Sequence, residues 1–426
     1  MTIQPAIASP GCGCDRSDPL STLIGIDEAL ARIVAQASPV VRPETVPLER
    51  AHGRVLAAPV RSRRAAPPFD NAAMDGYAIS TLTLTGPGPW DLRVVARVAA
   101  GQPATTAVAP GTAARIFTGA PIPVGADAVV MQEDTWRDGD VLRLSHRAAP
   151  GQNIRRAGSD MAQGAAVLDP GRKLGPRDLA ACAAAGAGTL PVRGRPRAAL
   201  LVTGDELRRA GGARAAAQIW DVNTPMLTAC LAAAGVDLIA TAHAADSLAG
   251  LIGQMGDLAA QADLVVTTGG ISVGEEDHVS PAVLALGGEI WVNGVAIKPG
   301  KPVTVGRIGT AHWLGLPGNP VSAFVTWQVF GQALLRGLTG QTGGALPRRH
   351  VVTAREIRRK PGRCELRPAT LAGFDALGRE VVQFDEATHS ARVNRLALAD
   401  GLMVLPAETA HLPAGALVEF QPFCEA

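Results

Sequence analysis

The stretch ADLVVTTGGISVGEEDH, Ala262 to His278, decides the fold class of this chain, together with VAIKPGKPVTVG, Val295 to Gly306, and WLGLPGNPVSAF, Trp313 to Phe324. In each of the three, an apolar run rich in β-branched residues stops at a polar loop that contains glycine. After the first and third loops the spacing becomes helical. This alternation predicts a doubly wound α/β sheet whose strand ends carry the functional site.

The first loop is suited to an anion and a cation together. Gly269 and Gly270 let backbone N–H groups approach a ligand closely, and the acidic triplet Glu275 to Asp277 falls where the next helix is expected to start. A helix N-terminus favours anions, and carboxylates beside it favour a divalent cation. The sequence therefore suggests a phosphate held together with a cation such as Mg²⁺.

The second loop carries two ammonium groups, Lys298 and Lys301, in one tight turn. The chain has only four lysines against 36 arginines, so this pair points to an anion site, although a solvated turn is the alternative. In the third loop, Pro317 to Pro320 opens a long apolar helix, Val321 to Leu338. These residues serve either as a helix entry or as a ligand contact.

The same alternation extends over the whole region from Arg197 to Gly340. AALLVTGDEL, Ala198 to Leu207, predicts a strand, and Thr224 is the expected cap of the helix that follows. Further strands are expected at Val236 to Thr241 and at Asp263 to Thr268.

Three carboxylates of this region are expected to share one edge of the sheet. If the sheet is parallel, Glu206, Asp246 and Asp277 lie at the carboxyl ends of strands, close to Lys298 and Lys301. Such a charge-paired rim suits ligand binding, and a structural network of ion pairs is the alternative.

Short β runs broken by glycine and proline lie on both sides of the α/β region, at Leu92 to Leu144 and beyond Pro347. They predict two small β domains. Helices are expected at Gly25 to Ala37 and at Arg177 to Ala185. The chain thus leaves an extended region, forms the first β domain and returns.

Three polar strings stand out in these flanking regions. PPFDNAAMDGYA, Pro67 to Ala78, is a rigid loop that presents carboxylates such as Asp75, which either bind a ligand or cap turns. Thr118 exposes a hydroxyl beside a glycine. Arg155 and Arg156 suit a phosphate or an acidic partner, with Asp160 to balance them.

Composition narrows the function classes. With 426 residues the chain is long enough for three or four domains, and 47% hydrophobic residues suffice to build their cores. The net charge of +2 gives no basic field, and 4% aromatic residues offer few stacking surfaces. Both values argue against nucleic acid as a partner.

The chain is expected to be cytoplasmic, without a membrane partner. Its start has no signal-peptide pattern, and no apolar run approaches the roughly 20 residues of a spanning helix. The six cysteines show no disulfide framework and are expected to be reduced. Cys12 and Cys14 form either an incomplete soft-metal site or part of a disordered tail.

Taken in order and spacing, seven strings resemble the molybdopterin molybdenumtransferases, the MoeA family, and are similar also to the E domains of gephyrin and of its plant counterpart. The resemblance starts near residue 20 and covers nearly the whole chain. The strings are PPFDNAAMDGYA, IFTGAPIP, QNIRRAGSDM, VTGDEL, TTGGISVGEEDH, VAIKPGKP and LGLPGNPVSA.

The resemblance implies an elongated homodimer with four domains in each subunit. It also implies a reaction that converts adenylylated molybdopterin and molybdate to molybdenum cofactor, with release of AMP and with Mg²⁺ as the usual cation. The implied domains are an extended domain from residues 20–62 and 152–195 after a disordered tail 1–19, an inserted β domain 63–151, an α/β molybdopterin-binding domain 196–345 and a C-terminal β domain 346–426.

The resemblance also assigns residues. The molybdate side comprises Lys298, Lys301, Pro302 and Ser272, with Arg367 and Ser390 from the last domain. Glu206, Asp246 and Asp277 resemble the carboxylates on the metal and anhydride side, and we expect them, with Ser272, to be catalytic. Asp75, Thr118 and Asp160 match positions for pterin binding that would reach the site of the partner subunit.

One string departs from the family pattern. Where many members have a serine-rich string with glycines, this chain has His389 to Arg395, in which Ser390 lacks the glycine neighbours. Two other functions stay open at this point, a molybdopterin adenylyltransferase and a non-catalytic cofactor carrier or scaffold. Possible protein partners are a molybdopterin adenylyltransferase and the enzymes that accept the cofactor.

Overall fold

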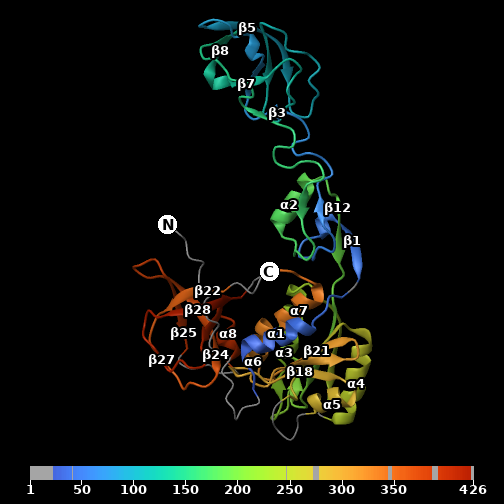
Figure 1. The fold of residues 1–426 in the computed structure, drawn as a ribbon. Helices are drawn as coiled ribbons and strands as arrows, with labels where there is room; N and C mark the ends of the chain where they lie inside the picture. Colours follow the sequence, from blue (N-terminus) through green and yellow to red (C-terminus); the bar gives the residue numbers. More distant parts are fainter. Residues whose placement is uncertain are drawn as a thin grey trace.

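The computed structural model describes residues 23–40, 42–245, 247–271, 278–343, 348–385 and 392–423. The molecule is elongated, with an inserted β sheet at one end and the α/β unit and a C-terminal β barrel side by side at the other (Figure 1). Among the described helices, none is both long enough and apolar enough to cross a membrane.

A six-stranded sheet in the order β16-β13-β17-β21-β20-β18 forms the α/β unit. Five of its strands share one direction, and β20 runs against both of its neighbours. The strands are β13 (Arg197–Thr203), β16 (Asp237–Ala244), β17 (Leu264–Thr268), β18 (Glu289–Asn293), β20 (Thr304–Ile308) and β21 (Ala311–Leu316). The predicted α/β fold is confirmed.

The reversed strand β20 is not expected from a purely parallel sheet. Only Gly309 and Thr310 separate it from β21, and two residues can close a hairpin but cannot carry a parallel crossover, which needs about a dozen residues. Thr304, the first residue of β20, therefore lies opposite Gly315 near the end of β21. The loop that carries the two lysines thus reaches the predicted edge from the start of a reversed strand.

Helices cover both faces of this sheet. Ala198, Leu200 and Val202 of β13 belong to one core with α1, α3, α6 and α7, whereas the alternate residues Ala199 and Leu201 belong to the other with α4 and α5. The helices are α1 (Ile26–Gln36), α3 (Asn223–Ala233), α4 (Leu248–Gln261), α5 (Val279–Ala285), α6 (Pro320–Thr326) and α7 (Gln332–Thr339).

The structure shows two details of these helices that the sequence does not predict. A π-helical turn, Trp327–Gly331, joins α6 to α7, so the expected helix from Val321 to Leu338 is continuous. We group residues 20–62 with the extended domain from the sequence, but α1 packs into the α/β core through Ile26, Ala29 and Ile33. Its apolar residues recur at helical spacing, and the sheet supplies the face that covers them.

Two segments far apart in the chain build the extended part. β1 (Pro43–Pro47) pairs with β12 (Thr189–Arg193), and β2 (Val60–Arg61) pairs with β11 (Ala166–Leu168). Their core includes Leu56, Leu190 and Cys182, the last from α2 (Pro176–Ala184). Where the chain leaves for the inserted sheet and returns, β3 (Asn71–Ala72) pairs with β10 (Ile154–Arg155), so the two connections run side by side (Figure 1).

The inserted sheet has six strands in the order β7-β4-β6-β5-β9-β8. It buries a hydrophobic cluster on each face, since Tyr77 and Ile79 of β4 belong to one cluster and Ala78 to the other. The strands are β4 (Gly76–Ile79), β5 (Trp90–Val98), β6 (Thr112–Ile116), β7 (Ala128–Met131), β8 (Thr135–Asp138) and β9 (Val141–Leu144).

The C-terminal strands close into a five-stranded barrel, because β26 pairs both with β28 and back with β24. The strands are β22 (Arg349–Thr353), β24 (Cys364–Phe374), β25 (Glu380–Phe384), β26 (Gly401–Leu405) and β28 (Leu417–Pro422). β19 (Ile297–Lys298), from the lysine loop of the α/β unit, adds to this sheet beside β24. Both predicted β domains are thus β structures.

We expect Gly76→Ala to destabilise the inserted sheet. A Cβ at this position would lie 1.9 Å from the backbone oxygen of Val130 on the neighbouring β7, so the two strands would have to separate. The expected loss is about 1–3 kcal/mol in the free energy of unfolding, measured by urea denaturation.

The matched control is Gly253→Ala, at an exposed position of α4 where an added Cβ meets nothing within 4 Å. This change should raise the stability by about 0.5–1 kcal/mol, because alanine is the better helix former. A Gly76→Ala protein as stable as the wild type would contradict the described pairing of β4 with β7.

Candidate active site

A pocket of about 760 Å³ lies at the carboxyl ends of β13, β17 and β21, where the sequence places the site. Its walls come from the loops that follow these strands, from the start of α3, and from Val393 in α8 (Val393–Leu396) of the C-terminal part. The lining includes Thr203, Gly204, Glu206, Asn223, Thr268, Gly269, Gly270, Pro302, Gly318 and Asn319.

The glycine loops approach each other too closely for side chains. Gly269 has φ +93°, and a Cβ there would lie 2.5 Å from the hydroxyl oxygen of Thr203 at the end of β13. A Cβ at Gly318 would lie in van der Waals contact with the loop, 3.5 Å from the Cα of Gly269. Glycine is therefore required at position 269, because only glycine lets the end of β17 approach the end of β13 this closely.

Asn223 joins these loops and is a residue that sequence reasoning missed. Its Nδ2 donates hydrogen bonds to Thr268 Oγ1 at 2.8 Å and to the carbonyl of Gly318 at 2.7 Å. The side chain is buried, and its Oδ1 has no partner among the described residues. Buried polar atoms are almost always hydrogen-bonded, so Oδ1 needs a donor, which a bound ligand or water would supply.

The start of α3 also differs from the expectation. We expect Thr224 to cap this helix, but the backbone N–H of Thr224 instead donates to Asp221 Oδ1 at 3.0 Å. The N-cap is Val222, two residues before Thr224, so the helix begins at Asn223 and the Asp221 carboxylate accepts an N–H group of its first turn. This shift frees Asn223 to connect the strand ends.

Glu206 lies on the exposed rim of the pocket, beside Gly204. The φ of Gly204 is +134°, and the carboxylate of Glu206 folds over it, 2.7 Å from the position of an added Cβ. A carboxylate in this place offers oxygen ligands of the kind that Mg²⁺ prefers. The predicted site residues Asp246, Ser272, Asp277 and Ser390 lie outside the described residues, so their relation to Glu206 stays a prediction.

The lysine loop sits against α6 beside the pocket. Gly300 has φ +104°, and a Cβ there would lie 2.4 Å from Thr326 Cγ2, so the loop packs closely on this helix. Pro302 lines the pocket, and Lys301 is exposed next to it. The structure thus places the loop, as predicted, at the same edge as Glu206.

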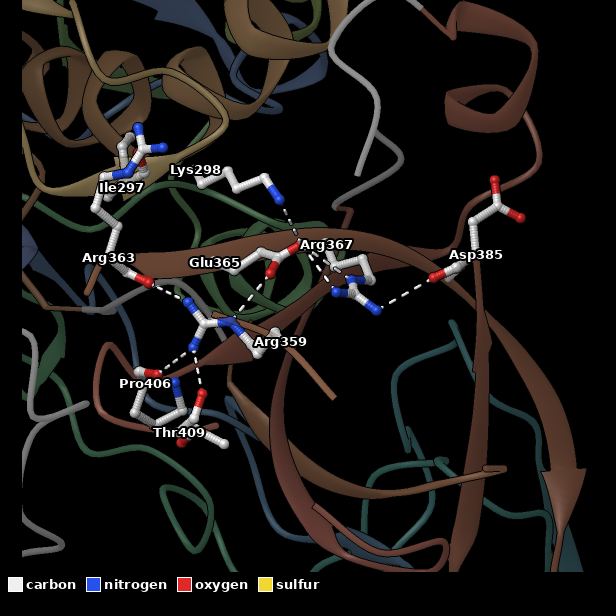
Figure 2. A network of polar contacts seen from close by, with 9 residues as sticks. All are labelled: Ile297, Lys298, Arg359, Arg363, Glu365, Arg367, Asp385, Pro406 and Thr409. Atoms are coloured by element: carbon white, nitrogen blue, oxygen red, sulfur yellow. Dashed lines mark hydrogen bonds and ion pairs between the residues drawn. The ribbon is translucent and has the colours of Figure 1, made fainter. Parts of the chain in front are cut away.

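A buried carboxylate, Glu365, gathers cations from two parts of the chain, as Figure 2 shows. Arg367 Nη2 lies 3.0 Å and Lys298 Nζ 3.8 Å from its Oε1, whereas Arg359 Nε lies 3.1 Å from its Oε2. We call these four residues the Glu365 cluster. It brings together two residues predicted for molybdate, Lys298 and Arg367, and sequence reasoning missed both Glu365 and Arg359.

The members of the Glu365 cluster differ in exposure. The side chains of Arg359 and Arg367 are 6% and 4% exposed, whereas that of Lys298 is 42% exposed. Arg359 is also held by the carbonyls of Pro406 and Thr409, at 2.7 and 2.9 Å, so it anchors the carboxylate to the barrel (Figure 2). Three cations against one carboxylate leave a charge of +2 within the cluster, which favours an anion beside it.

Asp75 and Thr118, both predicted to bind substrate, form a pair in the inserted sheet. Asp75 Oδ1 accepts hydrogen bonds from the backbone N–H and the hydroxyl of Thr118, both at 2.7 Å. The backbone N–H and then the hydroxyl hold the pKa of Asp75 below its usual value, so the carboxylate stays charged. Within one chain, the inserted sheet that carries this pair lies at the opposite end of the molecule from the α/β unit (Figure 1).

The connection to the inserted sheet has a different charge pairing from the one expected. Arg156 pairs with Asp70, whose carboxylate also accepts the backbone N–H of Ala157 at 2.8 Å. That N–H and the guanidinium of Arg156 lower the pKa of Asp70. Asp160, which we expect to balance the arginines, is exposed on the same connection.

Three family models together match most of the chain. They describe the "MoeA N-terminal region (domain I and II)" over residues 24–186, a "probable molybdopterin binding domain" over residues 199–337, and the "MoeA C-terminal region (domain IV)" over residues 350–423. The matched ranges include the inserted sheet, the pocket and the Glu365 cluster.

Characterised relatives and solved structures agree with these matches. The chain is 37% identical over 393 residues to "molybdopterin molybdenumtransferase 2" of Mycobacterium tuberculosis, covering 90% of this chain and 96% of the relative. It is 33% identical to the molybdopterin molybdenumtransferase of Haemophilus influenzae, covering 94% and 99%. The crystal structure of the molybdopterin biosynthesis moeA protein from Pyrococcus horikoshii superposes with a TM-score of 0.81 at 27% identity, over 94% of this chain and all of that one.

We expect Glu365→Ala to destabilise the C-terminal barrel, because it leaves buried Arg359 and Arg367 without their carboxylate. Removing one partner of a buried ion pair costs about 3–5 kcal/mol in the free energy of unfolding. Thermal and urea denaturation measure the loss. Glu356→Ala removes an exposed carboxylate of the same region that pairs with Arg358, and it should change stability little. Equal effects of the two changes would contradict the buried network.

Proposed function

The chain belongs to the MoeA family, the molybdopterin molybdenumtransferases, and we propose how its residues perform the transfer. It is a transferase that inserts molybdenum into molybdopterin. The match extends over the inserted sheet and the barrel as well as the α/β unit. This breadth disfavours the adenylyltransferase alternative, which resembles an α/β chain alone.

In the proposed reaction, adenylylated molybdopterin and molybdate are the substrates, and AMP is released. The Glu365 cluster is the single observation that carries the residue assignment. Molybdate is a tetrahedral dianion, and the cluster, with its charge of +2, includes Lys298 from the loop whose Pro302 lines the pocket. Charge-assisted hydrogen bonds from fixed cations suit such an anion.

We assign the cationic groups to two roles. Lys298 and Arg367 share Oε1 of Glu365, and with Lys301 they would hold molybdate, while Arg359 occupies Oε2 and keeps the carboxylate in place. Because Lys298 is the most exposed member of the cluster, it can turn from Glu365 to an incoming oxyanion. Ser272 and Ser390 complete the proposed molybdate side.

The proposed metal and anhydride side is formed by Glu206, Asp246 and Asp277. Glu206 fits this role, because its carboxylate lies on the rim of the pocket with its oxygens exposed. When bound, Mg²⁺ would neutralise charge on the phosphoanhydride of the adenylate. The carboxylates of the chain would hold the cation and orient the anhydride across the glycine loops.

We further propose a homodimer in which Asp75, Thr118 and Asp160 act on the partner's pocket. The charged carboxylate of Asp75 is half-buried directly before β4 of the inserted sheet, and that sheet lies at the end of the molecule away from the α/β unit (Figure 1). A second copy would bring a pocket to this end and so give the pair a substrate to orient. The cytoplasm is the proposed location.

The direct test follows AMP release by the purified protein from adenylylated molybdopterin. We expect release to need both molybdate and Mg²⁺, and Glu206→Ala to abolish it while the protein stays folded, because an exposed rim carboxylate has no core role. Tight pterin binding without any release would instead favour a carrier or scaffold. Full release by a folded Glu206→Ala protein would contradict the assignment of Glu206.

Lys301→Ala should weaken molybdate binding but not the binding of the adenylylated pterin. Loss of one ammonium group from a charged hydrogen bond is worth about 1.5–3 kcal/mol, so we expect molybdate affinity to fall roughly tenfold or more. Isothermal titration calorimetry with each ligand separately measures the difference. Lys360→Ala, which removes one of the remaining two lysines, is the control for charge. Equal loss of both ligands would contradict the division of the pocket.

A further inference from the structure

A second polar cavity lies at the opposite edge of the α/β sheet, between this unit and the extended part. β13 begins at Arg197, and Gly194, Arg195 and Pro196 before it line the cavity, whereas Thr203 at its other end lines the pocket described above. Seven residues of strand separate the two, or roughly 20 Å. The two linings have no residue in common.

The wall of this cavity is basic. Its charged lining residues are all cations and come from both parts of the molecule: Arg54, Lys173, Arg193 and Arg195 from the extended part and its connection to β13, and Arg336 from α7. Among the described residues, no aspartate or glutamate lines it. We call it the basic cavity.

In the part of the chain that the structure describes, carboxylates pair with only two of these five cations. Arg54 pairs with Glu44 at 2.7 Å, and Arg195 lies 3.5 Å from Asp237. Among the described residues, no carboxylate forms an ion pair with Lys173, Arg193 or Arg336. The undescribed segment that follows Gly343, residues 344–347, contains no acidic residue.

The guanidinium of Arg193 gives the most direct indication that the basic cavity holds a hydrogen-bond acceptor. Its Nε is buried and has no hydrogen-bond partner among the described residues. Buried N–H groups are almost always paired, so such an atom calls for an ordered water or an ion. Burial also lowers the pKa of the Arg336 guanidinium, as expected for a cation withdrawn from water without a counter-charge.

The end of α7 does not supply that partner. Its last carbonyl groups already accept hydrogen bonds: Leu335 from the Thr339 hydroxyl, Arg336 from the N–H of Gln341, Gly337 from the N–H of Gly340 and Leu338 from the N–H of Val40. The cations are therefore not required as helix caps. Their charge is left for something that enters the cavity.

Size and chemistry then restrict the ligand. The cavity offers about 60 Å³, several times the roughly 10–15 Å³ that one buried water needs, but too little for a nucleotide. Guanidinium groups recognise oxyanions through paired N–H donors. We propose that the basic cavity binds one tetrahedral oxyanion of the phosphate type, which ties α7 of the α/β unit to the extended part.

An anion in this site would hold the extended part and the α/β unit together. An anion bridging Lys173, Arg193 and Arg336 connects the extended part, which leads to the inserted sheet, to the unit that carries the pocket. The bound anion should therefore stabilise the folded chain by mass action. The inference does not depend on the proposed reaction, because its readouts are binding and stability.

The test is calorimetric titration of the full chain with inorganic phosphate in a chloride buffer, with thermal unfolding in parallel. The wild type should bind one phosphate per chain and unfold at a higher temperature as phosphate is added. Lys173→Ala and Arg193→Ala should each bind about tenfold more weakly or worse. Lys173 is exposed, so its variant should fold even if loss of Arg193 disturbs the packing around Gly340.

Two further variants sharpen the result. Arg177→Ala removes an exposed cation four residues from Lys173 that does not line the cavity, and it should bind phosphate like the wild type. Gln332→Glu places a carboxylate on the cavity wall without a change in side-chain size. It also removes the hydrogen bond that Gln332 Nε2 donates to Gln328 Oε1 at 2.9 Å, so its readout is the response to phosphate, which it should abolish.

The outcomes separate the possible oxyanions. If phosphate and sulfate both bind, and both bind more weakly to Lys173→Ala, the cavity is a general oxyanion site. If molybdate is the one anion of the three whose binding depends on Lys173, the cavity is specific for that metal oxyanion. The absence of saturable binding of any of the three at millimolar concentration would overturn the proposal. Binding of equal strength to the wild type and to Lys173→Ala would overturn it as well.

Discussion

One buried carboxylate, Glu365, connects the α/β unit to the C-terminal barrel. The backbone of β19 pairs with β24 at this point, with Lys298 opposite Glu365, so a strand ladder and an ion pair act at the same place. Because the loop of Lys298 also carries Lys301 and Pro302, the position of the cationic groups beside the pocket depends on this connection. Burial of the cluster makes that dependence strong, since a buried charge without its partner is costly.

The two edges of the α/β sheet carry different features, the pocket at one and the basic cavity at the other. At the carboxyl ends of the strands, glycine loops meet and leave a pocket bordered by Glu206 on one side and by the lysine loop on the other. At the opposite edge, the basic cavity lies where the extended part attaches. The pocket and the attachment of the extended part are thus separated by the length of the strands. The extended part can therefore be held in place without contacts to the pocket.

Much of this arrangement could be predicted from the sequence, because it depends on local patterns. The alternation of strands and helices, the glycine loops and the lysine turn all place chemistry at strand ends, and the family resemblance added Arg367. Glu365 could not be found in this way. It stands in β24 between Cys364 and Leu366, where the local sequence does not show that a carboxylate is buried, and the closure of the barrel and the approach of β19 cover it.

Two other features escaped prediction for the same reason. Asn223 looks like part of a helix start, and its role appears only when Thr268 and Gly318, distant in the sequence, come within hydrogen-bond reach. The reversed direction of β20 follows from a two-residue turn that the parallel pattern obscured. The sequence predicts Asp75 and Thr118 separately, and their hydrogen bonds show that the two residues are paired.

We propose that molybdate binds where the lysine loop meets the Glu365 cluster. Crystals of the protein soaked in molybdate and measured at the molybdenum absorption edge test it directly, because anomalous scattering locates the metal without reference to the chain. We predict a molybdenum peak within hydrogen-bond reach of Lys298, Lys301 and Arg367. A pocket-bound peak that none of these three side chains contacts would contradict the account.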